Sequence, residues 1–345
     1  MYRWNNDYNQ GAVPEILEAL SATNSTAYPG YGLDAWCEKA GSEIKKYLAC
    51  PNAEVHFMLG GTQVNYTMAA AALRPYQGVV CASSGHIHVH ETGAVENTGH
   101  KILAVPEVNG KLTADGIRAV AEDYRISGVQ EHITQPGMVF LSHPSEYGTI
   151  YTKAELQAIR KVCTEYGIMM YMDGARMGYG LGAADTDVTL ADIASLADAF
   201  YIGGTKCGAL FGEAVVLVND ALKDHFRAYM KQNGAMLAKG WLLGLQFDTL
   251  FKDGLYFDVT ARADAYAMQI KQAFQSAGIP LFYENTTNQQ FVILSNEQME
   301  QIGKNHIYEY EQRIDDTHHA VRFCTSWATQ AEAVEALIAD IGRLC

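Results

Sequence analysis

The chain has 345 residues, of which 48% are hydrophobic and 19% charged, and its net charge is −14. This length exceeds the size at which a single core usually keeps growing, so we expect one large and one smaller domain. The negative charge argues against a surface for nucleic acid or anionic membranes, because both need clustered Lys and Arg.

Seven cysteines are scattered along the chain without a C-x-x-C pair, which is typical of reduced thiols in a cytoplasm rather than of a disulfide framework. Met1 to Asp7 contain no apolar signal core, and no apolar run is long enough to span a bilayer. We therefore expect a soluble cytoplasmic protein with no membrane partner.

Strand and helix patterns alternate up to residue 218. Strands are expected at 55–59, 79–82, 101–105, 138–142, 168–172, 199–202 and 213–218. Helices are expected at 14–20, 33–48, 68–73, 113–122 and 152–166, the last opened by a capping box from Thr152 to Glu155. This alternation predicts an α/β fold with a mostly parallel sheet and helices on both faces.

Beyond residue 218 the pattern changes. Helices at 222–230 and 236–250 precede a hinge at 252–254. The remaining patterns are a helix at 258–277, a strand at 291–294, a helix at 296–305, a strand at 320–324 and a final helix capped at 329–332. We expect a large domain over residues 1–251 and a small C-terminal α/β domain over residues 252–345.

A single lysine, Lys206, follows the apolar run at 199–202 and stands among glycines. Its amine can form a Schiff base with a carbonyl cofactor. Asp173 ends an earlier apolar run, and a carboxylate there would keep a pyridine nitrogen protonated. Alone, these residues would be a solvated lysine and an Asp-Gly turn. Together they are what a pyridoxal phosphate site requires.

A glycine pair joins the strand at 55–59 to the next helix. Gly60, Gly61 and Thr62 lie where unpaired backbone N–H groups can bind a phosphate, and Thr62 adds a hydroxyl. By itself, this stretch favours an ordinary tight turn over a phosphate site.

Three histidines alternate ahead of a glutamate in the stretch 86–91. On a strand they would share one face and could bind a metal, but no Cys or Asp completes a familiar ligand spacing. A histidine at position 86 that stacks on a cofactor ring is the favoured interpretation.

Candidate residues follow several predicted strands directly. They are Gly60, His86, His143, Asp173 and Lys206. Because ligands of open α/β sheets bind at the carboxyl ends of the strands, these positions predict one site at that edge.

Motifs in order along nearly the whole chain resemble those of the threonine aldolase family of aspartate-aminotransferase-like (fold-type I) pyridoxal phosphate enzymes. They are Asn6-Asp7, Tyr31-Gly32-Leu33-Asp34, Gly60-Gly61-Thr62-Gln63-Val64-Asn65, Gly85-His86, Asp173-Gly174-Ala175-Arg176, Lys206 and Arg322. The stretches 146–151 and 203–206 are most similar to the phenylserine aldolase branch. The resemblance implies a mostly parallel seven-stranded sheet with helices on both faces.

The resemblance also implies retro-aldol cleavage of L-threonine, L-allo-threonine or a related β-hydroxy-α-amino acid, such as phenylserine, to glycine and an aldehyde. The implied catalytic residues are Lys206, His86, Asp173 and Glu146. The implied cofactor-binding residues are Gly60, Gly61, Thr62, His86, Asp173, Arg176, Thr205 and Lys206. The implied substrate-binding residues are Asn6, Tyr31, Arg176 and Arg322.

Two stretches depart from the family pattern. Glu146 stands where the family has a histidine proposed to help deprotonate the substrate hydroxyl, so the base is left open among His86, His143 and Glu146. The family loop that reaches a neighbouring active site is replaced at 233–238, with Lys231 as the nearby basic residue.

Other reactions fit the same scaffold, because the cofactor supplies the chemistry and small changes in the site select the broken bond. The alternatives are β-elimination, racemisation and transamination, and, less favoured, a regulator that binds the cofactor without catalysis. The resemblance further implies a homodimer or homotetramer with shared active sites.

Overall fold

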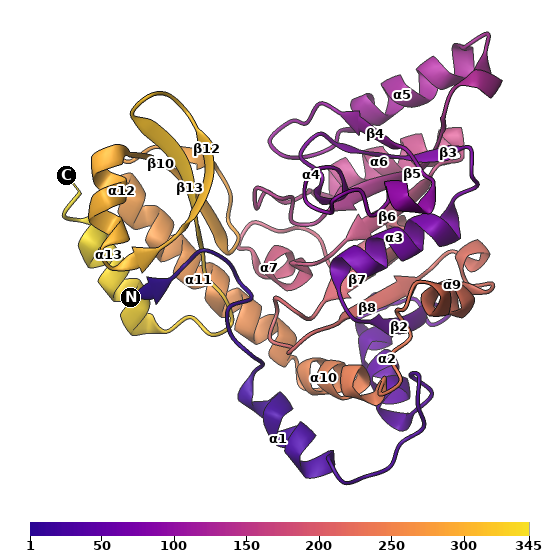
Figure 1. The fold of residues 1–345 in the computed structure, drawn as a ribbon, viewed down its shortest axis with the longest axis horizontal. Coiled ribbons are helices and arrows are strands. Elements are labelled where there is room, and N and C mark those ends of the chain that lie inside the picture. Colours follow the sequence, from indigo (N-terminus) through magenta and orange to yellow (C-terminus); the bar gives the residue numbers. More distant parts are fainter. Residues whose placement is uncertain (345) are drawn as a thin grey trace.

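A seven-stranded sheet forms the centre of the larger of two units in the computed structural model, which describes residues 1–344 (Figure 1). In spatial order the strands are β2 (Glu54–Met58), β8 (Glu213–Leu217), β7 (Ala199–Gly203), β6 (Met169–Asp173), β5 (Gln135–Ser142), β3 (Gln77–Ala82) and β4 (Ile102–Val105). β8 runs antiparallel to both neighbours and every other pairing is parallel. The expected mostly parallel seven-stranded sheet is confirmed.

Helices cover both faces of this sheet (Figure 1). The helices of this unit are α2 (Ala35–Leu48), α3 (Gly61–Ala72), α4 (His86–Val89), α5 (Ala114–Ile126), α6 (Lys153–Tyr166), α7 (Met177–Gly182), α8 (Leu190–Leu196), α9 (Phe226–Gln232) and α10 (Trp241–Phe251), while α1 (Pro14–Thr23) packs on α10 below the sheet (Figure 1). Alternate residues of each strand enter different cores: Met172 packs with α2, α5 and α6, whereas Tyr171 packs with α3 and α9. Burial on both faces explains why these strands are continuous apolar runs.

The predicted capping box starts α6. Thr152 Oγ1 accepts the backbone N–H of Glu155, whose carboxylate accepts the N–H of Thr152. The same helix ends at Gly167, which has a left-handed φ of 67° that glycine adopts at little cost.

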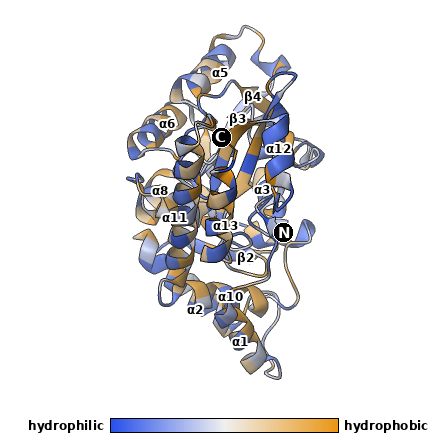
Figure 2. Cartoon of the chain, turned by 90° about the vertical axis from the view of Figure 1, so that its left-hand side faces the viewer, coloured by the Kyte–Doolittle hydropathy of each residue, from blue (hydrophilic) through white to orange (hydrophobic). Residues whose placement is uncertain are grey.

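A second unit is built on an antiparallel sheet. Its strands, in spatial order, are β12 (Glu309–Arg313), β13 (His318–Cys324), β10 (Gln289–Ser295) and β9 (Leu281–Tyr283). Its helices are α11 (Leu255–Ser276), α12 (Asn296–Gly303) and α13 (Ala331–Ile341). The unit has its own apolar core, and the solvent side of α12 is mostly hydrophilic in Figure 2. The expected small C-terminal α/β unit is confirmed.

The first residues of the chain pack on this C-terminal unit. β1 (Tyr2–Arg3) pairs with β11 (His306–Ile307), and Trp4 is buried in the core of the unit. The domain boundary at residues 251 and 252 stays a prediction.

Several local predictions are wrong. The helix expected at 236–250 begins only at Trp241, and β9 and β12 are not anticipated. Gln330, rather than Thr329, precedes α13, and the Thr329 hydroxyl accepts the Ser326 N–H instead. Residues 86–89 form a helical turn and not a strand, so the alternating histidines do not share a strand face. Among residues 1–344, no helix combines the length and the apolar character needed to cross a membrane.

Candidate active site

A cavity of about 980 Å³ lies at the carboxyl edge of the central sheet and extends to β12 and β13 of the second unit. It is lined by all the predicted site residues except three. The lining set includes Gly60, Gly61, Thr62, His86, Glu146, Asp173, Arg176, Thr205, Lys206 and Arg322. Asn6 and Tyr31 do not line it, and neither does His143. Segments far apart in the sequence therefore meet at one edge, as strand polarity predicts.

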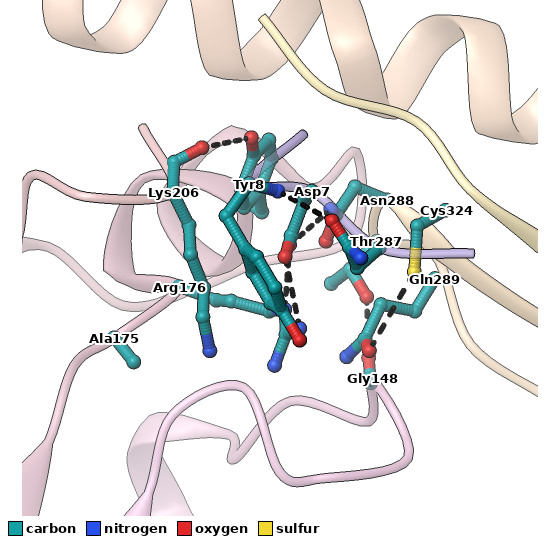
Figure 3. Close-up of polar contacts among 12 residues, drawn as sticks. Asp7, Tyr8, Gly148, Ala175, Arg176, Lys206, Thr287, Asn288, Gln289 and Cys324 are labelled. Carbon is teal, nitrogen blue, oxygen red and sulfur yellow. Dashed lines mark hydrogen bonds and ion pairs between the residues drawn. The ribbon is translucent and has the colours of Figure 1, made fainter. Parts of the chain in front are cut away.

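Lys206 follows β7 in a turn that permits close backbone contacts. A Cβ on Gly203 would come within 2.3 Å of the Ala175 carbonyl oxygen, so only glycine fits there. Burial lowers the pKa of the Lys206 amine, and the charge of Arg176 lowers it further. The Nζ atom lies 5.9 Å from the centre of the Tyr8 ring (Figure 3). A lowered pKa favours the neutral amine, which is the nucleophilic form.

Asp173 is buried and held in one orientation. Its Oδ1 accepts the Tyr201 hydroxyl at 2.5 Å and the Ala175 N–H at 2.9 Å, and its Oδ2 accepts Asn65 Nδ2 at 3.0 Å. These bonds occupy three of roughly four lone-pair positions of a carboxylate. One acceptor position on Oδ2 is left for a donor in the cavity.

His86 begins α4 and contacts two carboxyl groups. Its Nδ1 lies 2.7 Å from Glu91 Oε1, and its backbone N–H donates to Glu146 Oε1 at 2.8 Å. The Ser142 hydroxyl also donates to Glu146 Oε1, at 2.6 Å. Burial raises the pKa of Glu146 despite these hydrogen bonds, which act to lower it.

His143, in contrast, is fully buried outside the cavity. Burial, with a contribution from the charge of Lys111, lowers its pKa to about 4. Because the side chain is buried outside the cavity, its ring cannot contact a molecule there.

The glycine pair opens α3, where backbone N–H groups can bind an anion. A Cβ on Gly61 would come within 2.7 Å of the Tyr201 hydroxyl oxygen, so a side chain there has no room. Thr205 is already engaged: its hydroxyl donates to Glu213 Oε1 at 2.8 Å and accepts the Gly212 N–H at 3.0 Å.

Glu213 is a site residue that the strand pattern does not indicate. Because β8 is antiparallel to its neighbours, its amino end lies at the edge where the other strands end. Glu213 also accepts the Gly204 N–H at 3.1 Å. Burial raises the pKa of its carboxyl to about 8 despite the nearby charge of Lys206.

Arg176 forms a bidentate ion pair with Asp7 (Figure 3). Its Nε lies 2.7 Å from Oδ2 and its Nη2 lies 3.0 Å from Oδ1. Asn288 Nδ2 donates to the same Oδ2 at 2.9 Å. Burial alone would raise the pKa of Asp7, but the charges of Arg176 and Lys206 and these hydrogen bonds outweigh it and lower the pKa to about 2. Asp7 thus ties the N-terminal segment to both units.

Arg322 extends from β13 into the cavity. Its Nη2 donates to the Asn5 carbonyl at 3.1 Å and its Nη1 to Gln289 Oε1 at 3.3 Å. Its Nε lies 3.3 Å from Glu311 Oε1 without hydrogen-bond alignment. A guanidinium held by neutral groups and one loosely paired carboxyl can take a carboxylate ligand.

The two remaining candidates lie elsewhere. Asn6 Oδ1 accepts the backbone N–H of Tyr8, and it is Tyr8 that reaches the cavity. Tyr31 is 44% exposed and lines a second cavity of about 310 Å³ beside α2 and α9. Substrate binding by Asn6 and Tyr31 stays a prediction.

Comparisons with known proteins agree with this geometry. The family model described as beta-eliminating lyase matches residues 11–297. A low specificity L-threonine aldolase of a Pseudomonas strain is 30% identical over 342 residues, covering 97% of this chain and 95% of the relative. A Leishmania major threonine aldolase structure is 41% identical, with a TM-score of 0.97, and covers 100% of this chain and 99% of that one.

A Thermus thermophilus aspartate aminotransferase structure shares the fold at 12% identity, with a TM-score of 0.72 and coverage of 99% of this chain and 96% of that chain. The expected aminotransferase-like fold and the resemblance to threonine aldolases are both confirmed. The chain is a homologue of the threonine aldolases and belongs to the beta-eliminating lyase family.

Proposed function

We propose that this protein is a carbon–carbon lyase that uses pyridoxal 5′-phosphate to cleave L-threonine, L-allo-threonine or a related β-hydroxy-α-amino acid, phenylserine included, to glycine and an aldehyde. The observation that carries this proposal is the convergence of Lys206 and Asp173 on one cavity that also contains Arg322. The relatives named low specificity L-threonine aldolase support this choice of substrate.

The cavity residues fit the cofactor. Lys206 would bond its aldehyde carbon, and the vacant acceptor position on Asp173 Oδ2 would hold a proton on its ring nitrogen. The N-terminus of α3, with Gly60, Gly61 and Thr62, would bind its phosphate. When bound, the protonated ring stabilises the negative charge left at Cα as the Cα–Cβ bond breaks.

Two arginines would bind the substrate carboxylate. Arg322 lines the cavity from β13 of the second unit, and Arg176, which Asp7 holds through Nε and Nη2, lines it from the segment after β6. A guanidinium fork matches the planar geometry of a carboxylate, which fixes the substrate for bond cleavage.

The proposal includes a cytoplasmic location and a homodimer or homotetramer with shared active sites. Tyr31 supports shared sites, because the predicted substrate-binding residue is exposed and away from the cavity of its own chain.

One assay tests the activity. The purified protein with added pyridoxal 5′-phosphate is given L-threonine, L-allo-threonine or phenylserine, and glycine and aldehyde are measured. Equal release of both products is expected. Release of a 2-oxo acid and ammonia instead would favour β-elimination, and no product from any substrate would overturn the proposal.

An absorption spectrum tests the cofactor site independently of turnover. The protein with bound cofactor should absorb near the edge of the visible range, and Lys206→Ala should lose that band after dialysis. Retention of the band in the variant would show that another residue holds the cofactor.

A further inference from the structure

Glu91 is a buried carboxylate beside the cavity. Its side chain is 0% exposed, whereas that of its partner His86 is 36% exposed. Glu91 Oε1 lies 2.7 Å from His86 Nδ1 and 2.7 Å from Asn65 Nδ2. The ring of His86 thus has one nitrogen on a buried carboxylate and presents its other edge to the cavity.

The orientation of the Asn65 amide follows from its partners. Its Nδ2 lies within hydrogen-bond distance of both Glu91 Oε1 and Asp173 Oδ2, and its Oδ1 lies 2.8 Å from the Tyr171 hydroxyl. Carboxylates accept hydrogen bonds, so the amide nitrogen must face them. Burial first, and then the charge of Asp173, raises the pKa of Tyr171 well above its usual value, so the phenol stays a donor to Oδ1.

These contacts fix the position of a proton on His86. Glu91 Oε1 accepts the amide N–H of Asn65 at 2.7 Å, which a carboxylate oxygen does well and the hydroxyl oxygen of a protonated carboxyl does poorly. The short contact between the same oxygen and His86 Nδ1 is therefore made by a hydrogen on Nδ1. A neutral imidazole with that hydrogen carries its lone pair on Nε2.

We infer that Glu91 positions His86 as the base that accepts the proton of the substrate β-hydroxyl, an inference that rests on the proposed aldol cleavage. The substrate O–H bond breaks and the proton bonds to His86 Nε2. The oxygen electron pair forms the aldehyde C=O, and the Cα–Cβ pair stays with the carbon that becomes Cα of glycine. The Glu91 carboxylate stabilises the imidazolium that results.

Glu146 holds the same histidine in a different way. It accepts the backbone N–H of His86 and the Ser142 hydroxyl on one oxygen, so it fixes the main chain rather than the ring. The pKa of Glu146 is raised by burial, which favours the protonated carboxyl, and a protonated carboxyl cannot accept the substrate proton. Glu91 thus acts on the ring of His86 and Glu146 on its main chain, so substitutions of the two glutamates should have different effects.

Histidine ¹⁵N NMR of the protein with bound cofactor tests the position of the proton, with the His86 signals identified by their loss in His86→Gln. The wild type and Glu146→Gln should both show the Nδ1–H form of His86. Glu91→Met, which offers no acceptor of comparable strength, should lose that preference. An Nε2–H form in the wild type would overturn the inference, whether or not the protein cleaves threonine.

Kinetics then test the catalytic consequence. Glu91→Gln preserves shape but removes the charge, so kcat should fall by about 100-fold while KM changes by less than about 3-fold. Glu165→Gln, on an exposed ion pair with Arg118, is the matched control and should retain wild-type kcat. An unchanged kcat in Glu91→Gln would overturn the role of Glu91. Absence of activity in the wild type would instead refute the proposed function.

Discussion

The Thr205 hydroxyl donates a hydrogen bond to the buried carboxyl of Glu213 at 2.8 Å, directly beside Lys206. Glu213 also accepts the Gly204 N–H, so one carboxyl holds the backbone on the amino side of the lysine. The one hydrogen of the Thr205 hydroxyl is consequently used in the bond to Glu213. Phosphate binding by Thr205 stays a prediction, and its hydroxyl could take part only if Glu213 changed its contacts.

Glu213→Gln should change how stability depends on pH. The wild-type carboxyl has a pKa of about 8 when folded, against 4.5 for an unperturbed Glu, so unfolding between these pH values releases a proton. The contribution of Glu213 to the free energy of unfolding therefore falls as pH rises through this window, by an amount on the order of 5 kcal/mol at most. Glutamine removes that dependence.

Urea unfolding of the cofactor-free proteins at pH 5, 6.5 and 8 checks this expectation. The stability of Glu213→Gln relative to the wild type should rise steadily across the series. A constant difference between the two proteins would show that Glu213 is already ionised at pH 5.

Tyr201→Phe should weaken the hold on Asp173. The substitution removes a buried hydroxyl that donates to Asp173 Oδ1 at 2.5 Å and leaves that oxygen with the Ala175 N–H alone. A hydrogen bond to a charged group contributes about 1.5–3 kcal/mol to stability. Urea unfolding should show this loss, and equilibrium dialysis should show weaker binding of pyridoxal 5′-phosphate. Wild-type values for both quantities would contradict the role given to this hydroxyl.

Asp7→Asn should destabilise the protein most at neutral pH. The charge of Asp7 compensates that of Arg176, and removing one partner of a buried pair costs about 3–5 kcal/mol. Because the folded pKa of Asp7 lies near 2, below the ordinary 3.8, its contribution is complete above about pH 4 and is lost as pH falls towards 2. The difference in unfolding free energy between variant and wild type should shrink between pH 5 and pH 2.5, and a difference independent of pH would contradict the pairing.

The sequence predicts the residues that follow parallel strands. Gly60, Asp173 and Lys206 could be placed at one edge because a period-2 or continuous apolar run reveals a strand and its carboxyl end. Glu213 could not be placed there, because the amino end of β8 reaches the same edge only through its antiparallel pairing with β2 and β7. Strand direction is a property of the assembled sheet.

Residues that contact the predicted ones are harder to find. Three side chains orient Asp173 or His86: Asn65 from α3, Glu91 from the segment after α4, and Tyr201 from β7. Asn65 and Glu91 belong to stretches that the sequence analysis noted, 60–65 and 86–91, but neither stretch indicates that these two side chains contact Asp173 or His86. Local patterns identify a carboxylate and a lysine, but long-range pairing decides which side chains orient them.

Gly61→Ala should destabilise the protein because the new Cβ clashes with a single atom, the Tyr201 hydroxyl oxygen. The new Cβ would lie 2.7 Å from the Tyr201 hydroxyl oxygen and 3.5 Å from Cζ, and the phenol cannot move away without losing Asp173. Overpacking of this kind costs about 1–3 kcal/mol.

Gly60 provides the comparison, because a Cβ there has nothing within 4 Å and Gly60→Ala should therefore unfold at nearly the wild-type urea concentration. The double variant Gly61→Ala with Tyr201→Phe lacks the clashing oxygen. Its loss of unfolding free energy should therefore be smaller than the sum of the losses in the two single variants. Simple additivity of the two substitutions would show that Gly61 is not constrained by Tyr201.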